Sequence, residues 1–142
     1  MDDLEVSFFI MPAEALRMLR KEIEEALGPE FATSILFRYG FRCGSEIIKM
    51  LKMEEYGLSE VLSEVWAEVG LGNIVSIECS DNIVVDISNC AEGSFEGGDG
   101  CDFARGYLAG IASAVLKKPM HAYEELCVKR GDNICRHVIK RL

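Results

Sequence analysis

Residues 101–142 read CDFARGYLAGIASAVLKKPMHAYEELCVKRGDNICRHVIKRL, and this stretch decides the fold. A helical pattern of apolar residues covers about 102–116. Two β-rich runs follow, near 121–129 and 133–141, with a turn signal at Gly131 between them. The sequence therefore predicts a helix that leads into a β-hairpin.

Potential metal ligands are spaced along this stretch. Thiols are supplied by Cys101, Cys127 and Cys135, and a carboxylate by Glu124 or Glu125. Thiolate and carboxylate donors together suit a tetrahedral Zn²⁺ site that would tie the start of the helix to the hairpin. Residues three apart on a regular strand point to opposite faces, which puts Glu125 beside Cys127. Glu124 can take that place only if the strand is bulged or irregular there.

Upstream of this stretch, the pattern predicts a strand, three helices and a second hairpin. The fold class we expect is α+β, with an antiparallel sheet of about five strands packed against about four helices. A polar, glycine-rich loop, 91–100, precedes the last helix. The expected upstream strands and helices are a strand at 4–11, helices at about 15–27, 31–52 and 58–69, and paired strands at 73–79 and 82–88.

The composition fits one soluble globular domain that spans residues 1–142, with 49% hydrophobic and 27% charged residues. The net charge of −9 makes nucleic acid and anionic membranes poor partners. No apolar run reaches the length of a membrane span, and the acidic start, Met1-Asp2-Asp3, is unlike a secretion signal. We therefore expect a cytoplasmic protein.

Six cysteines without a secretion signal indicate free thiols or metal ligands rather than a disulfide framework. Cys43 and Cys79 lie in apolar patterns and are expected to be buried. Cys90, at the end of a strand-like run, is an alternative ligand. We expect both histidines, His121 and His137, at the surface without a metal or catalytic role.

The segment from Cys90 to Arg141 resembles the 4-vinyl-reductase domain family, which is also described as predicted hydrocarbon-binding proteins. The segment 39–44, YGFRCG, resembles the glycine-marked second helix of that family. The resemblance implies a fold similar to the ligand-binding domains of trafficking-complex subunits and of a haem-based nitric-oxide sensor. The C-terminal residues that carry it are Cys101-Asp102-Phe103, Gly106, Gly110, Tyr123-Glu124-Glu125-Leu126-Cys127, Gly131-Asp132 and Cys135.

Relatives in this family include sensor domains of bacterial activators that respond to phenolic compounds. The resemblance implies a zinc held by Cys101, Glu124, Cys127 and Cys135, with an aromatic ligand in an adjacent apolar pocket. It therefore favours Glu124 over Glu125. Four protein ligands leave no open coordination position, so such a zinc would be structural. Other relatives are linked to reduction of a vinyl group during bacteriochlorophyll synthesis.

Aromatic and glycine residues on the predicted helices suit a pocket or close helix packing. The glycine pairs Gly40/Gly44 and Gly106/Gly110 each lie four apart on one helix face. Missing side chains leave room for a ligand or let a neighbouring helix approach, in a dimer interface or within the chain. The candidate ligand-binding residues are Phe37, Trp66, Phe103 and Tyr107.

We expect a regulatory module that binds a hydrophobic or aromatic small molecule, carries a structural zinc and forms a homodimer. The alternatives are a reductase or accessory protein acting on a vinyl-bearing tetrapyrrole, and an assembly module with a vestigial pocket. The sequence shows no dinucleotide or Walker-type glycine loop and no catalytic triad pattern. This leaves enzymatic activity open but favours a binding role.

Overall fold

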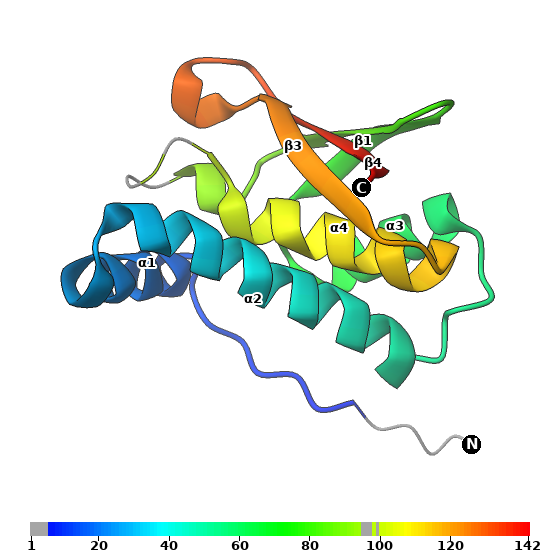
Figure 1. Ribbon diagram of the computed structural model, residues 1–142, viewed down its shortest axis with the longest axis horizontal. Helices are drawn as coiled ribbons and strands as arrows, with labels where there is room; N and C mark the ends of the chain where they lie inside the picture. Colours follow the sequence, from blue (N-terminus) through cyan, green and yellow to red (C-terminus); the bar gives the residue numbers. More distant parts are fainter. Residues whose placement is uncertain (1–5, 95–97, 99) are drawn as a thin grey trace.

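The structure is a computed structural model that describes residues 6–94, 98 and 100–142. It confirms the α+β class, with four helices and one antiparallel sheet (Figure 1). In the described residues the sheet has four strands rather than about five. The helices are α1 (Glu14–Leu27), α2 (Pro29–Met50), α3 (Leu58–Val69) and α4 (Asp102–Leu116), and the strands are β1 (Asn73–Cys79), β2 (Ile83–Ser88), β3 (Met120–Leu126) and β4 (Cys135–Arg141).

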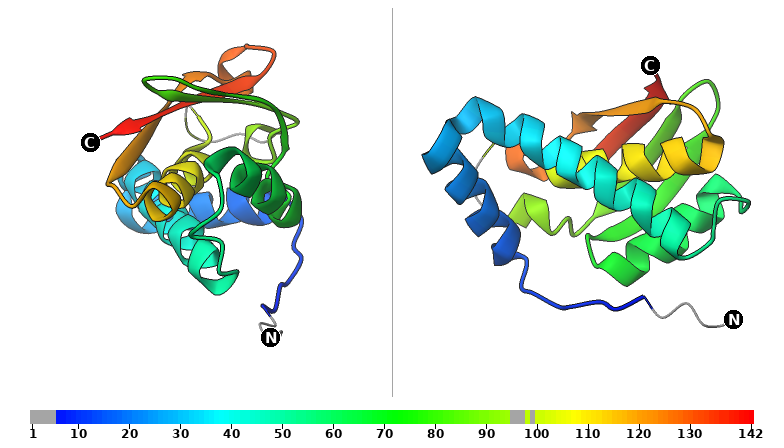
Figure 2. Two further views of the ribbon diagram at one scale, coloured as in Figure 1. Left: turned by 90° about the vertical axis from the view of Figure 1, so that its right-hand side faces the viewer. Right: turned by 60° about the horizontal axis from the view of Figure 1, so that its bottom comes forward.

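The predicted strand at 4–11 accounts for the missing fifth strand. Leu4 and Glu5 lie outside the described residues, and residues 6–11 have no regular secondary structure. Figures 1 and 2 show this segment passing along the helices, on the side of the molecule away from the sheet. Its apolar residues therefore lie against helices, where no strand edge is available for pairing, and the prediction is wrong for this reason.

The sheet has the strand order β1-β2-β4-β3 and is antiparallel throughout. Along β2, Ile83, Val85 and Ile87 alternate toward the helices and are buried. This period of two follows from the pleat of a strand and gives the sheet one apolar face. The helices cover that face, as Figure 2 shows in its left view.

The helices α2 and α4 pack against each other backbone to backbone. A Cβ added to Gly110 would lie 2.9 Å from the Ser45 nitrogen, and one added to Gly44 would lie 3.1 Å from the Ile111 nitrogen. Gly40 and Gly106 leave equally little room, against Tyr107 and Phe37. The close-packing interpretation of the glycine pairs is therefore confirmed within one chain, and these faces are not free to form a dimer interface.

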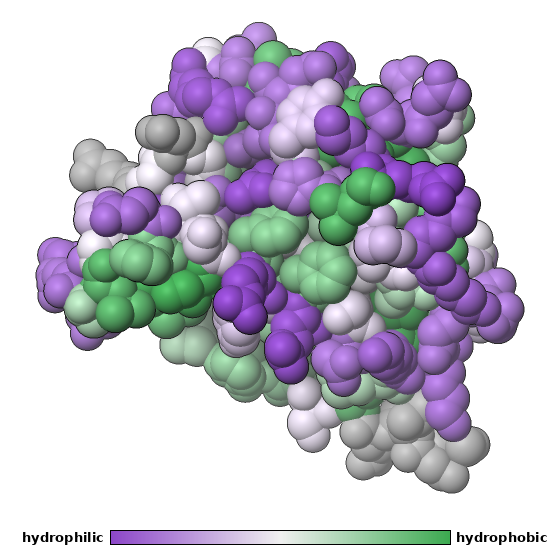
Figure 3. Space-filling view, viewed as in Figure 1, coloured by the Kyte–Doolittle hydropathy of each residue, from purple (hydrophilic) through white to green (hydrophobic). Residues whose placement is uncertain are grey.

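Helix α1 departs from the expected pattern of burial. Its one buried residue is Arg20, whose guanidinium pairs with the carboxylate of Asp102 at the start of α4. Apolar side chains of α1 and the start of α2 remain exposed, among them Leu19, Leu27 and Phe31. Figure 3 shows apolar side chains gathered at this end of the molecule. None of the helices in the described ranges has the length and apolarity that a bilayer-crossing segment needs.

Candidate metal centre and ligand cavity

Three thiols from separate elements meet beneath the end of the sheet. Cys101 directly precedes α4, Cys127 follows β3, and Cys135 begins β4. All three are buried, and their sulfur atoms are 3.8 to 4.0 Å apart. A tetrahedral zinc with Zn–S bonds of about 2.3 Å requires sulfur atoms about 3.8 Å apart. The thiols therefore have the spacing of metal ligands and are too far apart for disulfides.

The hairpin turn sets the position of Cys127. A short 3₁₀ turn, Val128–Arg130, ends at Gly131, whose φ of 95° is the left-handed conformation that glycine adopts without strain. The backbone N–H of Cys127 donates to the Asp132 carboxylate at 2.9 Å. This local bond closes the loop and brings Cys127 opposite Cys135.

A bulge in β3 selects between the two candidate carboxylates. Glu124 pairs with His137 and Leu126 pairs with Arg136, so Glu125 is an extra residue without a partner of its own. This shift turns Glu124 inward, to the face of the thiols. Glu125 remains exposed on the outer face, 3.5 Å from the Arg136 guanidinium.

The Glu124 carboxylate completes a four-residue donor set. Its ligand atom and the sulfur atoms of Cys101, Cys127 and Cys135 all lie within 4.8 Å of one another. Oε1 accepts the backbone N–H of Cys101 at 3.0 Å, whereas Oε2 is buried and has no hydrogen-bond partner among the described residues. Three buried thiols and an orphaned carboxylate oxygen fit a zinc ion, because each donor can satisfy the metal and the metal compensates their charge.

The remaining cysteines lie outside this donor set. Cys90 is a fourth buried thiol beside the cluster, and hydrogen bonds with Cys101 and Cys135 lower its pKa. It donates to the Ile87 carbonyl at 3.4 Å, which leaves it next to the donor set rather than within it. Cys43 is half-buried and Cys79 is exposed, so the prediction of burial is wrong for Cys79, at the end of an edge strand.

The expectation that His137 is exposed is wrong, because its side chain is fully buried. It lies on the inner face of β4, two residues after Cys135, and burial lowers its pKa to about 4. Its Nε2 is 3.5 Å from Oε2 of Glu124. The alternation of Cys135, His137 and Ile139 along the strand was the signal in the sequence that could have shown this. His121 is half-buried, with its ring 5.3 Å from that of Phe37.

Glu92 is a buried residue that the sequence gave no reason to select. Its carboxylate accepts the backbone N–H groups of Phe103 and Ala104, at 2.9 and 2.8 Å. These are unpaired donors in the first turn of α4, so Glu92 caps the helix from a distant loop. Burial raises the pKa of Glu92 to about 7.

The larger of two neighbouring cavities, about 780 Å³, lies between the N-terminal segment and the helices. Phe103 and Tyr107 of α4 line it, with Tyr39 and Cys43 of α2. Residues 6–11 form one of its walls. The cavity is mainly apolar, and its polar atoms include the thiol of Cys43 and the Tyr39 hydroxyl, whose pKa is raised by the nearby Cys43.

The four predicted ligand-binding residues fall into two places. Trp66 is fully buried and packs edge-on against Tyr107, 5.9 Å between ring centroids, and Tyr107 packs against Phe103. Phe37 lies on a different side of α2, where the Arg105 guanidinium stacks on its ring at 4.4 Å. Three of the four aromatics are therefore brought together at the cavity, and Phe37 is not.

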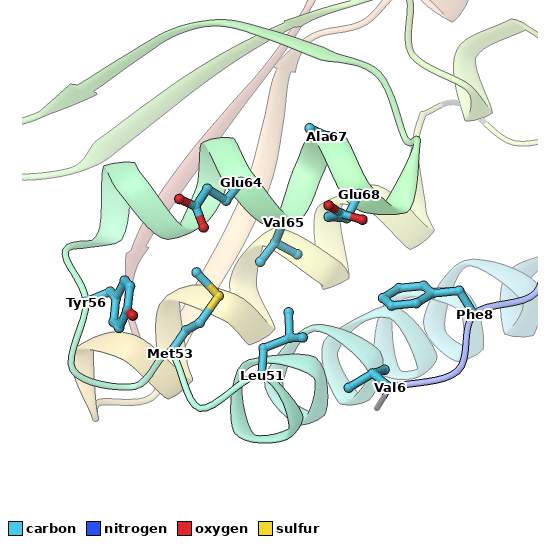
Figure 4. Close-up of a pocket in the computed structure, with 9 residues that line it drawn as sticks. All are labelled: Val6, Phe8, Leu51, Met53, Tyr56, Glu64, Val65, Ala67 and Glu68. Atoms are coloured by element: carbon cyan, nitrogen blue, oxygen red, sulfur yellow. The ribbon is translucent and has the colours of Figure 1, made fainter. Parts of the chain in front are cut away.

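A second cavity of about 660 Å³ continues along the N-terminal segment (Figure 4). Figure 4 shows Val6 and Phe8 on one side, across from Val65 and Glu68 of α3. Val6, Phe8 and Glu68 line both cavities. The N-terminal segment thus lies across a continuous apolar groove between α2 and α3.

Comparison with known families gives two matches in succession along the chain. Residues 5–67 match the family model "Activator of aromatic catabolism", and residues 83–141 match that of the 4-vinyl-reductase domain. The resemblance to the 4-vinyl-reductase family is thereby confirmed. The uncharacterized protein MJ0150 of Methanocaldococcus jannaschii is 25% identical over 111 residues, which are 75% of this chain and 64% of that protein. The chain therefore spans less than two thirds of that relative.

Solved structures share the fold. The phenol-responsive sensory domain of the transcription activator PoxR, with phenol, has a TM-score of 0.78 and 24% identity over 96% of this chain and 78% of that chain. A vinyl-4-reductase family protein from M. jannaschii has a TM-score of 0.65 and 20% identity over 97% and 85%. A trafficking protein particle complex subunit 3 from Naegleria fowleri, covalently bound to palmitic acid, has a TM-score of 0.68 and 12% identity over 92% of each chain. An H-NOX protein from S. oneidensis has a TM-score of 0.66 and 15% identity over 99% and 82%.

Proposed function

Because residues 83–141 carry a 4-vinyl-reductase domain, we propose that this chain is a regulatory module that binds a small hydrophobic or aromatic molecule. The observation that carries the proposal is the apolar cavity lined by Phe103 and Tyr107. Its volume of about 780 Å³ is in the range of small-molecule sites. An assembly module with a vestigial pocket would have a filled interior here.

The polar groups around the cavity favour a ring that carries one hydrogen-bonding substituent. The indole N–H of Trp66 is buried and has no hydrogen-bond partner among the described residues. A ligand oxygen would satisfy it, while the rings of Phe103 and Tyr107 would stack on an aromatic body. The phenol-bound PoxR domain, which shares the fold, supports phenol as the first ligand to try.

Phenol binding can be followed by calorimetry and by the fluorescence of the single tryptophan, Trp66. Cys43→Phe should abolish binding because it fills the cavity without removing a core residue. Lys49→Phe is the matched control, since Lys49 is exposed on the same helix and does not line the cavity. Loss of binding in both variants, or in neither, would contradict this location of the site.

We infer that a structural zinc is held by Cys101, Glu124, Cys127 and Cys135. Bound there, the metal would stabilise the fold by fixing the hairpin to the start of α4. Purified protein should contain one zinc per chain by elemental analysis, and Cys127→Ser should lose it. Recovery of zinc-free protein with all three thiols reactive would refute the metal centre. The site needs reduced thiols, which suits a reducing compartment such as the cytoplasm.

We further propose that the chain forms a homodimer through the exposed apolar end that includes Leu19, Leu27 and Phe31. Contiguous apolar surface of this kind marks interaction sites. Light scattering should give the mass of two chains, and Leu19→Glu should shift it toward one. An unchanged dimer in this variant would place the interface elsewhere. Titration with a tetrapyrrole, followed by absorbance, tests the reductase alternative.

A further inference from the structure

His137 is fully buried, yet neither of its ring nitrogens has a hydrogen-bond partner among the described residues. Leaving a buried polar group unsatisfied costs about 1–3 kcal/mol. An apolar side chain would avoid this cost at a position that faces the core between Cys135 and Ile139. The presence of an imidazole therefore calls for a partner that its nitrogen atoms can serve.

The backbone register brings that partner to it. His137 and Glu124 are opposite each other in the β3–β4 pairing, with both side chains on the inner face of the sheet. The Nε2 atom of His137 is 3.5 Å from Oε2 of Glu124. Both atoms are buried and lack other hydrogen bonds, so the two unsatisfied groups face each other. A shift of about half an ångström would give an ordinary N–H···O hydrogen bond.

The two oxygens of Glu124 have different surroundings. Oε1 accepts the backbone N–H of Cys101 at 3.0 Å, and the Arg130 guanidinium approaches the same oxygen at 4.0 Å. Oε2 has the His137 ring as its neighbouring donor. The orientation of the carboxylate toward the three thiols therefore depends on a contact at each oxygen.

We propose that His137 positions Glu124 for the metal, with its Nε2–H donating to Oε2. The inference rests on the proposed zinc centre. Side chains that bind metals are commonly held by a second hydrogen bond, whose loss lowers metal affinity by about 10–100-fold. A donor at this place also offsets the excess negative charge of three thiolates and a carboxylate around one divalent ion.

The test measures the zinc affinity of the full chain by competition with a chromophoric chelator. His137→Phe keeps a ring of similar size without a donor, and should weaken zinc binding by about 10–100-fold. His137→Gln keeps a donor and should fall between this variant and the natural chain. His121→Phe is the matched control, since His121 lies on the same sheet against Phe37 and should leave the affinity unchanged.

Two further readouts separate positioning from other roles. The melting temperature of the metal-free protein should not fall in His137→Phe, whereas a purely structural role would lower it. The Co²⁺ spectrum should keep its thiolate and ligand-field bands at weaker affinity. If His137→Phe does not fold, His137→Leu provides a second variant without a donor.

Unchanged zinc affinity in the donor-free variant would overturn the proposal. Shifted Co²⁺ bands would also overturn it, because they would make His137 a ligand itself. If the natural chain binds neither zinc nor cobalt at one per chain, the metal centre fails and the role of His137 fails with it. That failure is distinguishable because it is seen without any variant.

Discussion

Alanine at Gly106 and Gly110 should force α2 and α4 apart. On an isolated helix, each change from glycine to alanine favours the helix by about 1 kcal/mol. In this chain the new methyl group at Gly110 would lie 2.9 Å from the Ser45 nitrogen, and the one at Gly106 would overlap the Phe37 carbonyl. These are backbone atoms, which cannot rotate away as a flexible side chain can. The helices must separate, and their buried contacts loosen.

The expected magnitude follows from two opposing terms. Overpacking costs about 1–3 kcal/mol at each site, so two sites cost about 4 kcal/mol, from which helix propensity recovers about 2. The net loss of about 2 kcal/mol is large beside a typical domain stability of about 5–15 kcal/mol. It corresponds to a fall in Tm of about 4–8 °C for a chain of this size.

Urea unfolding followed by circular dichroism measures this loss in the double variant G106A/G110A. The matched control is Gly57→Ala, because a Cβ at Gly57 meets no atom within 4 Å and its φ is −68°. The control should change the free energy of unfolding by no more than about 0.5 kcal/mol. If the double variant is as stable as the natural chain or more so, helix propensity alone decides and backbone contact between the helices is refuted.

Three other substitutions test buried and paired charges. Arg20→Met should cost about 3 kcal/mol in urea unfolding, because it deprives the buried Asp102 of an ion-pair partner, and Asp102→Asn in the same background should recover part of the loss. Hydrogen bonding to Arg136 lowers the pKa of Asp86, so its contribution is present at neutral pH and lost as the pH falls through the lowered folded value. The Tm of Asp86→Asn should therefore match the natural chain in acid and fall below it at neutral pH, by less than about 1 kcal/mol. Burial raises the pKa of Glu92 to about 7, so the folded state holds the proton more tightly and stability decreases as the pH rises from about 4.3 to 7. Glu92→Gln should remove that slope from a series of melting temperatures.

The parts of the fold that could be predicted are those set by local periodicity. The helix at 58–69 and the strand at 73–79 have the predicted bounds, because apolar spacing and flanking glycines define them. The thiol cluster followed from ligand chemistry and the hairpin turn. The place of Glu124 did not, because strict alternation favours Glu125 and the bulge is visible only in the paired strands.

The errors arose where distant contacts decide burial. The apolar positions of α1 predicted its buried face, yet Arg20 is buried there because Asp102, 82 residues away, provides its counter-charge. Glu92 was missed because a loop residue gives no periodic signal, and it is fixed by unpaired N–H groups on another element. His137 is different, since the period of two after Cys135 already placed it on the inner face and basic neighbours in sequence were the wrong guide.

Helix α4 joins the thiol cluster and the cavity in one rigid element. Cys101 directly precedes the helix, and Tyr107 lines the cavity on its second turn, about 9 Å further along at 1.5 Å per residue. The glycine contacts with α2 prevent α4 from moving sideways without opening the opposite cavity wall, which includes Tyr39. A metal that fixes Cys101 to the hairpin would therefore also fix the aromatic wall. The two sites would share a free energy of coupling, and by linkage each occupant would raise the affinity for the other by the same factor.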